Sequence, residues 1–253
     1  MNPDSNPGQP DPALERVARC SRFGRLLLAA QPRLADEVAP RLGRPFTRAD
    51  MDAFLASPVG VDEATLHQRM RQLRQRVWLV TTARDLAGQA DLAEVVATWS
   101  TLAEVCIGAA LDFHHAALAA RHGEPRDAED RPQRMVVVGM GKLGGGELNV
   151  SSDIDLIYLY PQEGETRADA PGAAVRPLSN HEFFVRLGRK LAAALAETTA
   201  DGYVFRVDLR LRPWGDSGPL AMGFDMLEDY LVAQGRPWER YAWIKARPLT
   251  GAR

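Results

Sequence analysis

RMVVVGMGKLGGGELNVSSDIDLIYLY, residues 134–160, decides the fold of this chain. Its first apolar run, Met135 to Val138, predicts a β-strand, and a second apolar run after a glycine-rich turn predicts another. Asp153 and Asp155 stand at the head of that second strand, separated by one residue. Side chains at i and i+2 of a strand share a face, so these two carboxylates lie roughly 6–7 Å apart at the backbone.

This pair of aspartates predicts a metal site. Two ionised carboxylates held so close repel each other unless a cation bridges them, and Mg²⁺ is a hard cation that prefers oxygen ligands. The glycine-rich turn, followed by Ser151 and Ser152, can bring backbone N–H groups to phosphate oxygens. The unit therefore predicts phosphoryl or nucleotidyl transfer. The alternative is that Asp-Ile-Asp only starts a strand and the glycines form an ordinary turn.

Spacing excludes two common nucleotide-binding motifs. Gly139-Met-Gly141-Lys-Leu-Gly144 matches the dinucleotide-binding signature, which requires a crossover helix of about ten or more residues before the next parallel strand. Only Gly145 to Ser152 separate this turn from the next strand, and the acidic pair stands at the start of a strand rather than near its end. A Walker-type loop is excluded because a leucine follows Lys142 where Ser or Thr is needed.

The second informative stretch is YVFRVDLRLRP, from Tyr203 to Pro213. Its alternation predicts a strand with an apolar face and with Asp208 among three arginines, Arg206, Arg210 and Arg212, on the other face. A solvent-exposed antiparallel strand has the same pattern. With the two aspartates upstream we favour a site, because a third carboxylate completes metal coordination and arginines hold phosphates in a bidentate manner.

Composition narrows the class of protein. The chain has 253 residues, 45% of them hydrophobic, and a net charge of −2, which argues against a bulk nucleic-acid or membrane-surface binder. Cys20 and Cys106 lack metal-ligand spacing, so we expect reduced core thiols in a cytoplasmic protein. Residues 1–12 show no signal-peptide pattern and are expected to be a disordered leader, and no apolar run is expected to reach the ~18 residues of a membrane span.

The remaining sequence predicts helices around the central unit. Helices are expected from Ala13 with a break near Pro32, around 51–55 after a capping box at Thr47, from Asp62, from Asp91, from Ser179, and around 226–231 and 238–244. Residues 121–133 predict a surface connection, and residues 161–177 predict a long irregular loop. Arg69, Arg71, Arg74 and Arg76 are expected to form a solvated helix face, and His114 and His115 to be ordinary helix residues.

Three stretches of the sequence together resemble one protein family: GMGKLGGGELNVSSDIDLIYLY, FRVDLRLRPWGDSGPL and GRPWERYAWIKAR. They are similar to the N-terminal, adenylyl-removing part of the bifunctional glutamine synthetase adenylyltransferase/adenylyl-removing enzymes, in the DNA-polymerase-β-like nucleotidyltransferase superfamily. The resemblance implies an α+β fold, a helical N-terminal region followed by a mixed sheet with flanking helices. It implies two Mg²⁺ ions held by Asp153, Asp155 and Asp208.

The resemblance also implies a reaction and its partners. The phosphate-cradling turn of the superfamily corresponds to Gly144, Gly145 and Gly146, with glycine where many relatives have serine. The implied reaction removes AMP from an adenylylated tyrosine of glutamine synthetase by attack of inorganic phosphate, and the full-length enzyme also adenylylates with ATP. The implied partners are glutamine synthetase, nucleotide, phosphate and a PII-type nitrogen-signalling regulator that binds other regions. The candidate phosphate ligands are Arg206, Arg210 and Arg212, with Lys142 a weaker one, unless some of these arginines only pair with acidic neighbours.

Family enzymes are far longer than this chain, so we expect a fragment. We divide it into the leader, a helical region at 13–122 and a catalytic domain at 123–253 that is truncated at its C-terminal end. A truncated domain leaves apolar side chains uncovered, and those expected to be exposed are Trp238, Tyr241, Trp243 and Ile244. Two other functions stay open: a non-catalytic docking fragment, and a nucleotidyltransferase that acts on a small substrate without a protein partner.

Overall fold

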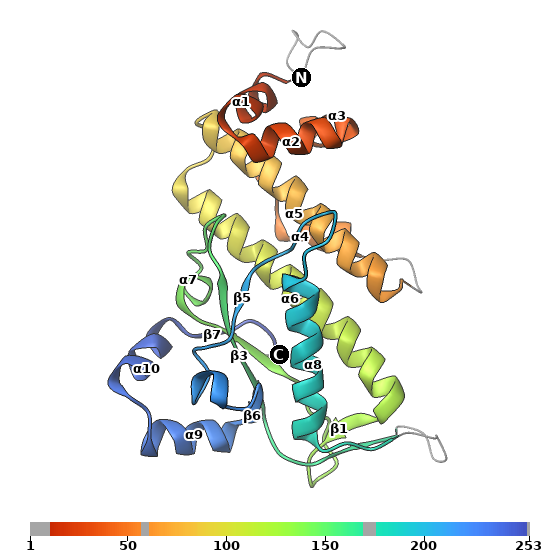
Figure 1. Cartoon of the computed structure of the whole chain (residues 1–253), viewed down its shortest axis with the longest axis vertical. Helices are drawn as coiled ribbons and strands as arrows, with labels where there is room; N and C mark the ends of the chain where they lie inside the picture. Colours follow the sequence, from red (N-terminus) through yellow and green to blue (C-terminus); the bar gives the residue numbers. More distant parts are fainter. Residues whose placement is uncertain (1–10, 57–60, 169–175, 252–253) are drawn as a thin grey trace.

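The computed structural model describes residues 11–56, 61–168 and 176–251. Most of the expected leader lies outside these residues, but Asp11 caps the first helix and Pro12 begins it. The N-terminal half is helical, as expected, and Figure 1 shows two long helices, α5 and α6, lying side by side, with shorter helices packed on α5. The helices are α1 (Pro12–Cys20), α2 (Arg22–Ala30), α3 (Pro32–Val38), η1 (Ala39–Arg41), α4 (Arg48–Leu55), α5 (Glu63–Leu86) and α6 (Leu92–His122).

Side-chain caps explain where these helices begin. Asp62 and Asp91 accept hydrogen bonds from the third backbone N–H of α5 and α6, and Thr47 forms a reciprocal capping box with Asp50 at α4. The expected break at Pro32 is present, and Ser21 adds a second break because it caps α2. The expected helix starts are therefore confirmed, with three short helices where one or two were expected.

Helix α6 lies at the centre of the helical packing. It is long and apolar enough to cross a membrane by length and composition, which the sequence reading did not anticipate. It packs against α4, α5 and α8, and the side chains of Trp99, Leu102 and Ile107 are fully buried, as in the core helix of a globular protein. Cys106 is buried here, and burial raises its thiol pKa to about 12, but Cys20 is exposed and is not a core thiol.

The arginine-rich face of α5 is not solvated, contrary to expectation. Arg71 is only 2% exposed and donates to the carbonyls of Gly202 (2.9 Å) and Glu197 (2.8 Å). The guanidinium of Arg74 stacks on the ring of Tyr203 at 4.8 Å. The sequence pattern misled because long arginine side chains can bury their stems while the head reaches backbone carbonyls or aromatic faces of another element.

The C-terminal half contains a mixed sheet. Its five strands run in the order β5-β3-β2-β7, with β6 also pairing with β3. The central strand β3 is antiparallel to β2 and parallel to β5 and β6. An antiparallel β2–β3 pair confirms that the glycine-rich turn does not belong to a dinucleotide-binding crossover. The elements are β2 (Val136–Gly139), α7 (Gly141–Gly144), β3 (Ile154–Tyr160), α8 (Asn180–Ala196), β5 (Val207–Asp208), η2 (Gly215–Ser217), β6 (Ala221–Gly223), α9 (Phe224–Ala233), α10 (Pro237–Ala242), η3 (Trp243–Lys245) and β7 (Arg247–Pro248).

Helices cover both faces of this sheet. Leu156, Tyr158 and Tyr160 of β3 join the large core shared with α5, α6 and α8. Ile157 and Leu159 point to the opposite face and join a smaller cluster that includes Leu227 of α9 and, at its margin, Trp243. Alternation along β3 thus separates two cores, and the expected α+β fold with a mixed sheet and flanking helices is confirmed.

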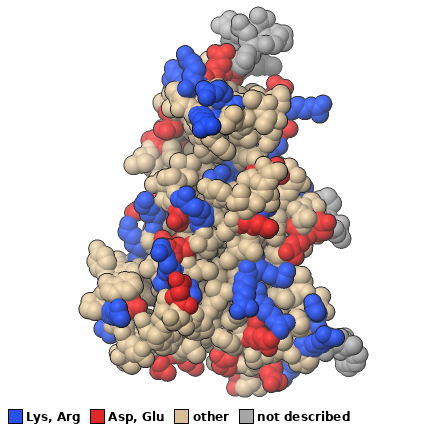
Figure 2. Space-filling model, viewed as in Figure 1, with Lys and Arg blue, Asp and Glu red and all other residues tan. Residues whose placement is uncertain are grey.

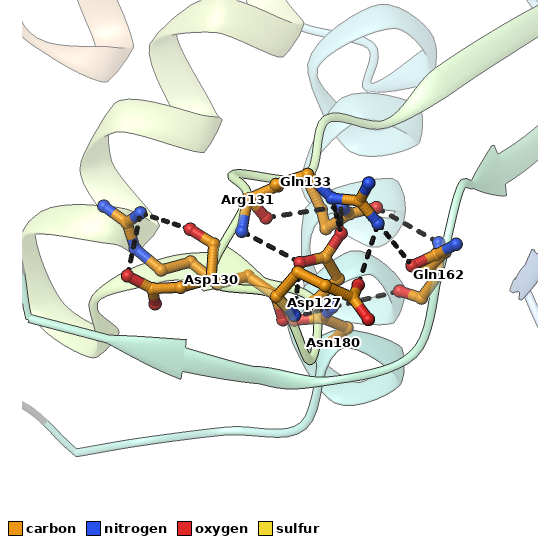
Figure 3. Close-up of polar contacts among 8 residues, drawn as sticks. Asp127, Asp130, Arg131, Gln133, Gln162 and Asn180 are labelled. Carbon is orange, nitrogen blue, oxygen red and sulfur yellow. Dashed lines mark hydrogen bonds and ion pairs between the residues drawn. The ribbon is translucent and has the colours of Figure 1, made fainter.

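The connection after α6 is ordered by a polar network. It carries β1 (Glu124–Arg126), which pairs with β4 (Glu165–Arg167) inside the segment expected to be an irregular loop; residues 169–175 of that segment lie outside the described residues. Figure 3 shows the carboxylate of Asp127, 2% exposed, accepting from Arg131 and Gln133. Gln133 accepts in turn from the backbone of Gln162, and Asn180 donates to the Gln162 carbonyl. The network fastens the connection to the end of β3 and the start of α8.

Two further expectations have different outcomes. The strand expected at 203–213 is wrong for most of its length, because only Val207 and Asp208 pair with β3 and the chain turns directly after them. The expected exposure near the end of the chain is confirmed for Trp238 (52%), Tyr241 (76%) and Ile244 (73%). Trp243 is only partly exposed, since it packs on the smaller core.

Candidate nucleotidyl-transfer site

Three aspartates meet where β3 and β5 lie side by side. Asp155 and Asp208 are direct partners in the parallel β3–β5 register. Asp153 stands one residue before β3, two positions from Asp155. Directly paired residues of neighbouring strands project to the same face of a sheet. Local sequence therefore places Asp153 and Asp155, and the parallel pairing of a distant segment adds Asp208.

The alternation of β3 also explains why these carboxylates are accessible. Asp155 shares its strand face with Ile157 and Leu159, which α9 and its neighbours cover further along the strand. Asp155 itself is half-buried, and the side chain of Asp153 is 48% exposed. The site is the point at which the smaller apolar core opens to solvent.

Burial and neighbouring like charges both disfavour the ionised form of Asp155. Burial raises the pKa of Asp155, and the neighbouring carboxylates of Asp208 and Asp153 raise it further against the opposing effect of Arg210 and Lys142. The pKa of Asp208 is lowered instead, first by the hydrogen bond from Arg210. A half-buried carboxylate held between two others binds a proton or a cation more readily than an isolated aspartate does.

The three candidate arginines have three different environments. The guanidinium of Arg206 donates to the carboxylate of Asp153 and to the Ser151 carbonyl. Arg210 donates to both carboxylate oxygens of Asp208 at 3.0 Å, and its side chain is 74% exposed. Arg212 is mostly buried.

Arg212 acts on the local backbone rather than on a carboxylate of the site. It donates to the Leu209 carbonyl at 2.6 Å, and its side chain lies 3.6 Å from Asp216. Arg206 and Arg210 therefore pair with acidic neighbours in this structure, which was the alternative to phosphate binding. Arg212 instead stabilises the turn after β5.

The glycine-rich segment is a short helix, α7, followed by a turn. Gly144 is buried, and a Cβ there would lie 2.0 Å from the carbonyl oxygen of Lys245, so glycine is needed for packing against η3. Gly145 and Gly146 follow in the turn, and Gly146 has a φ of +70°. A role of these three glycines in cradling phosphate stays a prediction.

Sequence reasoning did not single out Gly141 for this site. Its φ is +52°, and a Cβ there would lie 2.9 Å from Oδ2 of Asp155. Only glycine lets the backbone approach this carboxylate so closely in that conformation. The sequence did contain a signal for Gly141, since it belongs to the G-x-G pattern that was excluded as a dinucleotide-binding motif. In this different fold the glycine still allows a close approach, here of the backbone to a carboxylate.

Asn149 is a second residue that sequence reasoning missed. Its side-chain oxygen accepts from the backbone N–H of Ser151 at 3.1 Å and from the hydroxyl of Ser152 at 2.8 Å. Lys142 donates to the Ser152 hydroxyl at 3.4 Å. Asn149 thereby orders the loop that delivers Asp153, an arrangement typical of asparagine in turns.

The donor set fits Mg²⁺. Carboxylate oxygens are the ligands that hard divalent cations prefer, and three carboxylates from two strands supply them here. Burial, and then the charges of Asp208 and Asp153, raise the pKa of Asp155, and a divalent cation would offset both effects. Asp153, Asp155 and Asp208 are the residues that would hold it.

A mixed sheet with covering helices and an acidic cluster at its open edge defines the nucleotidyltransferase class of α+β proteins. The family model of glutamate-ammonia ligase adenylyltransferase matches residues 12–253, and the chain belongs to this family. The chain is 51% identical to the bifunctional glutamine synthetase adenylyltransferase/adenylyl-removing enzyme of Nitrosomonas eutropha over 237 residues, which is 92% of this chain and 25% of that protein.

Proteins with the same name from other bacteria match equally well. The identity is 51% over 253 residues in Aromatoleum aromaticum, covering 100% of this chain and 26% of the relative. It is 52% over 227 residues in Burkholderia pseudomallei, covering 88% of this chain and 24% of the relative. The chain thus spans about a quarter of the length of the curated relatives it matches, and the family resemblance of its motifs is confirmed.

Proposed function

We propose that this chain carries the adenylyl-removing site for glutamine synthetase and acts there by Mg²⁺-dependent phosphorolysis. Inorganic phosphate would attack the phosphorus of an AMP–tyrosine ester, so that a new P–O bond gives ADP while the bond to the tyrosine oxygen breaks and that oxygen takes up a proton. Support comes from the family, from the printed names of the relatives, and from the acidic cluster. A cytoplasmic location and a PII-type regulator acting through other regions belong to the same proposal.

The single observation that carries the proposal is the register that places Asp155 opposite Asp208. Asp153, Asp155 and Asp208 would hold two Mg²⁺ ions. When bound, these ions would supply positive charge to the phosphate oxygens of the transferred group and to the attacking and leaving oxygens. Because phosphate is already anionic, the reaction needs cations to offset repulsion more than it needs a strong general base.

Arg206 and Arg210 are suited to receive that phosphate. Both guanidinium groups lie against the carboxylates of the cluster, and both are largely exposed to solvent. Arginine binds phosphate through paired N–H donors, so a change of rotamer would move each side chain from its carboxylate to an incoming anion. Lys142 on α7 adds a cation on the side of Ser152.

The experiment uses adenylylated glutamine synthetase as substrate, with Mg²⁺, with or without inorganic phosphate, and identifies the nucleotide released. ADP that appears only with phosphate, and disappears in Asp153→Asn, is the expected result. Asp216→Asn is the matched control, because its side chain is 80% exposed and carries no assigned role in the cluster. AMP released equally well without phosphate would mean that water is the nucleophile and that the arginines do not bind phosphate.

A second function is favoured by the exposed apolar residues of α10 and η3. Trp238, Tyr241 and Ile244 are exposed, and exposed large apolar side chains suit docking to glutamine synthetase or to another protein without any catalysis. Binding of glutamine synthetase without nucleotide release, unchanged by Asp153→Asn, would support this function and contradict the proposal. Release of nucleotide from a small adenylylated substrate, with none from the protein substrate, would instead indicate a small-substrate nucleotidyltransferase.

A further inference from the structure

Helices α5 and α6 bring together a second cluster of ligand-bearing side chains, away from the three aspartates. Glu63 and His67 lie one turn apart on α5, and His114 comes from α6. One ligand atom from each residue lies within 4.8 Å of the others. We propose that Glu63, His67 and His114 form a zinc site that joins the two longest helices.

The spacing of the two imidazoles carries this proposal. Nε2 of His67 lies 3.2 Å from Nε2 of His114. Two histidine nitrogens bound to one tetrahedral Zn²⁺ at 2.0–2.1 Å are separated by about 3.3–3.4 Å, so these rings already stand at the distance that a shared zinc requires. Glu63 supplies a third ligand from the same face of α5, because positions i and i+4 of a helix are neighbours.

The burial of His114 is the second observation. This side chain is 0% exposed, and its Nδ1 has no hydrogen-bond partner among the residues that the structure describes. The two rings can share one N–H between their Nε2 atoms, but either tautomer of His114 then leaves Nδ1 buried without a partner. Zinc bound at Nε2 would fix Nδ1 as the protonated nitrogen and would leave it without a partner too, so this atom does not decide between the two arrangements. His114 therefore contributes a fully buried imidazole whose Nε2 faces Nε2 of His67.

Access to the cluster comes from the side of Glu63. A cavity of about 600 Å³ is lined by Glu63 and His67, and Glu197 and Asp201 face the same space. Glu63 is exposed and His67 is partly exposed, so a zinc ion and a water as fourth ligand can enter from solvent. His114 does not line this cavity; it is fully buried and contacts His67.

Two cations lie close to the cluster, Arg71 in the lining of the cavity and Lys190 paired with Glu63. Nζ of Lys190 lies 3.3 Å from the Glu63 carboxylate, and its side chain is 40% exposed, so it can turn to solvent when the carboxylate binds zinc. Arg71 remains bonded to two backbone carbonyls. Burial lowers the pKa of both His67 and His114, which keeps their nitrogen lone pairs free for a metal at neutral pH.

The donor set separates this cluster from the aspartates. Two imidazoles and one carboxylate suit zinc, whereas the all-oxygen set at β3 and β5 suits Mg²⁺. A metal bridging α5 and α6 would stabilise the contact between them and bind only the folded chain. The inference is independent of the catalytic proposal, since it concerns other residues and another metal.

The test titrates the full 253-residue chain with Zn²⁺ by calorimetry, in millimolar Mg²⁺ so that the aspartates are occupied. The expected result is one zinc per chain, with the dissociation constant raised at least tenfold in Glu63→Gln and in His67→Gln. Glu197→Gln is the control, because it removes a carboxylate facing the same cavity and should leave binding unchanged. Neither single ligand variant removes buried His114, and circular dichroism verifies that each is folded.

A second readout identifies the ligands. Co²⁺ in the same site should give the visible absorption of four-coordinate cobalt with nitrogen and oxygen ligands, and His67→Gln should abolish it. Zinc should raise the Tm of the unaltered chain and leave that of His67→Gln unchanged. Absence of zinc binding, or zinc binding unaffected by both ligand variants, would overturn the proposal.

Discussion

Two aspartates in different halves of the molecule have opposite electrostatic environments. Asp50, in the capping box of α4, accepts from Arg44 at 2.7 Å and pairs with Arg41 at 2.8 Å, and these contacts push its pKa far below the usual range. Asp155, on β3, is half-buried and lies beside Asp208 and Asp153, and burial first and these neighbours second raise its pKa. The same residue type is therefore stabilised as an anion in one region and destabilised in the other.

The difference separates charges that hold the fold from charges that serve a site. In the helical half, ionised groups meet opposite charges or backbone carbonyls, as Asp50 and Arg71 do, and acidic and basic side chains lie interspersed over the face drawn in Figure 2. At the edge of the sheet Asp153 and Asp208 pair with arginines, but Asp155 is half-buried beside them with a raised pKa, which works against stability and is typical of metal-binding and catalytic sites. Substitutions in the two regions should accordingly move different observables.

The largest effect is expected from Asp155→Asn. If the cluster holds the metal, losing this carboxylate should reduce the rate of ADP release on the order of 10³-fold or more, because several kcal/mol of transition-state stabilisation disappear. Thermal unfolding of the variant without metal should show no loss of stability, since the substitution removes a repelled charge. The assay of nucleotide release and the measurement of Tm are made on the same preparation.

If Asp155→Asn lost both activity and folding, Asp155 would be a structural residue, and the distinction between charges that stabilise the fold and charges that serve the site would be wrong. Asp216→Asn again controls for a change of charge close to the site and should change neither the rate nor the Tm appreciably.

The opposite pattern is expected from Arg71→Met in the helical half. The variant leaves the carbonyls of Gly202 and Glu197 without their charged donor, which should lower the free energy of unfolding by about 3 kcal/mol. For a chain of this size that corresponds to a fall in Tm of roughly 6–12 °C. Urea unfolding followed by circular dichroism measures the effect. Arg189→Met, on the exposed face of α8, should stay within about 0.5 kcal/mol, and an equal loss in both would contradict the assignment.

Much of the fold could be read from the sequence because its signals are local. Thr47, Asp62, Asp91 and Ser179 each cap the helix expected to follow them. The two apolar runs around the glycine-rich turn form β2 and β3. The length of β5 could not be predicted from the sequence. The apolar residues continue to alternate past Asp208, but the chain turns there and leaves their side chains half-buried, and a longer strand would show the same alternation.

The part of the candidate site that lies on a single segment of the chain could be predicted from the sequence. Asp153 and Asp155 follow from their spacing, and the placement of Asp208 next to them depends on a parallel pairing between segments some fifty positions apart. The contacts of Gly141 with Asp155 and of His67 with His114 have no local signal, since each joins separate elements. Arg71 was misjudged for the same reason, because its acceptors lie on a distant loop.

A smaller effect is expected from the two arginines of the site. Replacing Arg210 by Met should raise the KM for phosphate about 10–100-fold with a lesser change in kcat, because a charged hydrogen bond to an anion contributes about 1.5–3 kcal/mol. Arg206→Met should behave similarly, and Arg210→Lys should restore part of the affinity. Steady-state rates at varied phosphate concentration give these constants.

Arg212→Met provides the contrast within the same stretch. Arg212 bonds to the Leu209 carbonyl and is mostly buried, so its loss should lower Tm and leave the KM for phosphate nearly unchanged. An equal rise of the KM for phosphate in Arg206→Met, Arg210→Met and Arg212→Met would contradict this assignment of different roles to the three arginines.

The smallest effect is the pH dependence of stability, which tests the two aspartates directly. Asp50 has a lowered pKa in the folded chain, so its contribution is present above the unfolded pKa of about 3.9 and is lost as pH falls below it. Asp155 has a raised pKa, so the folded chain binds its proton more tightly and stability rises as pH falls through that value.

Without metal at pH 7, Asp50→Asn should destabilise the chain by about 1 kcal/mol through the weakened cap. Asp155→Asn should stabilise it by less than about 1 kcal/mol because its site is open to water. At pH 4.5 the penalty of Asp50→Asn should persist, since this pH is still above 3.9, while the gain from Asp155→Asn should already have shrunk. Urea unfolding of both variants at the two pH values, in a chelator, measures the four differences. A destabilised Asp155→Asn at pH 7 would show that its neighbours do not repel it, and the contrast between the two regions would then fail.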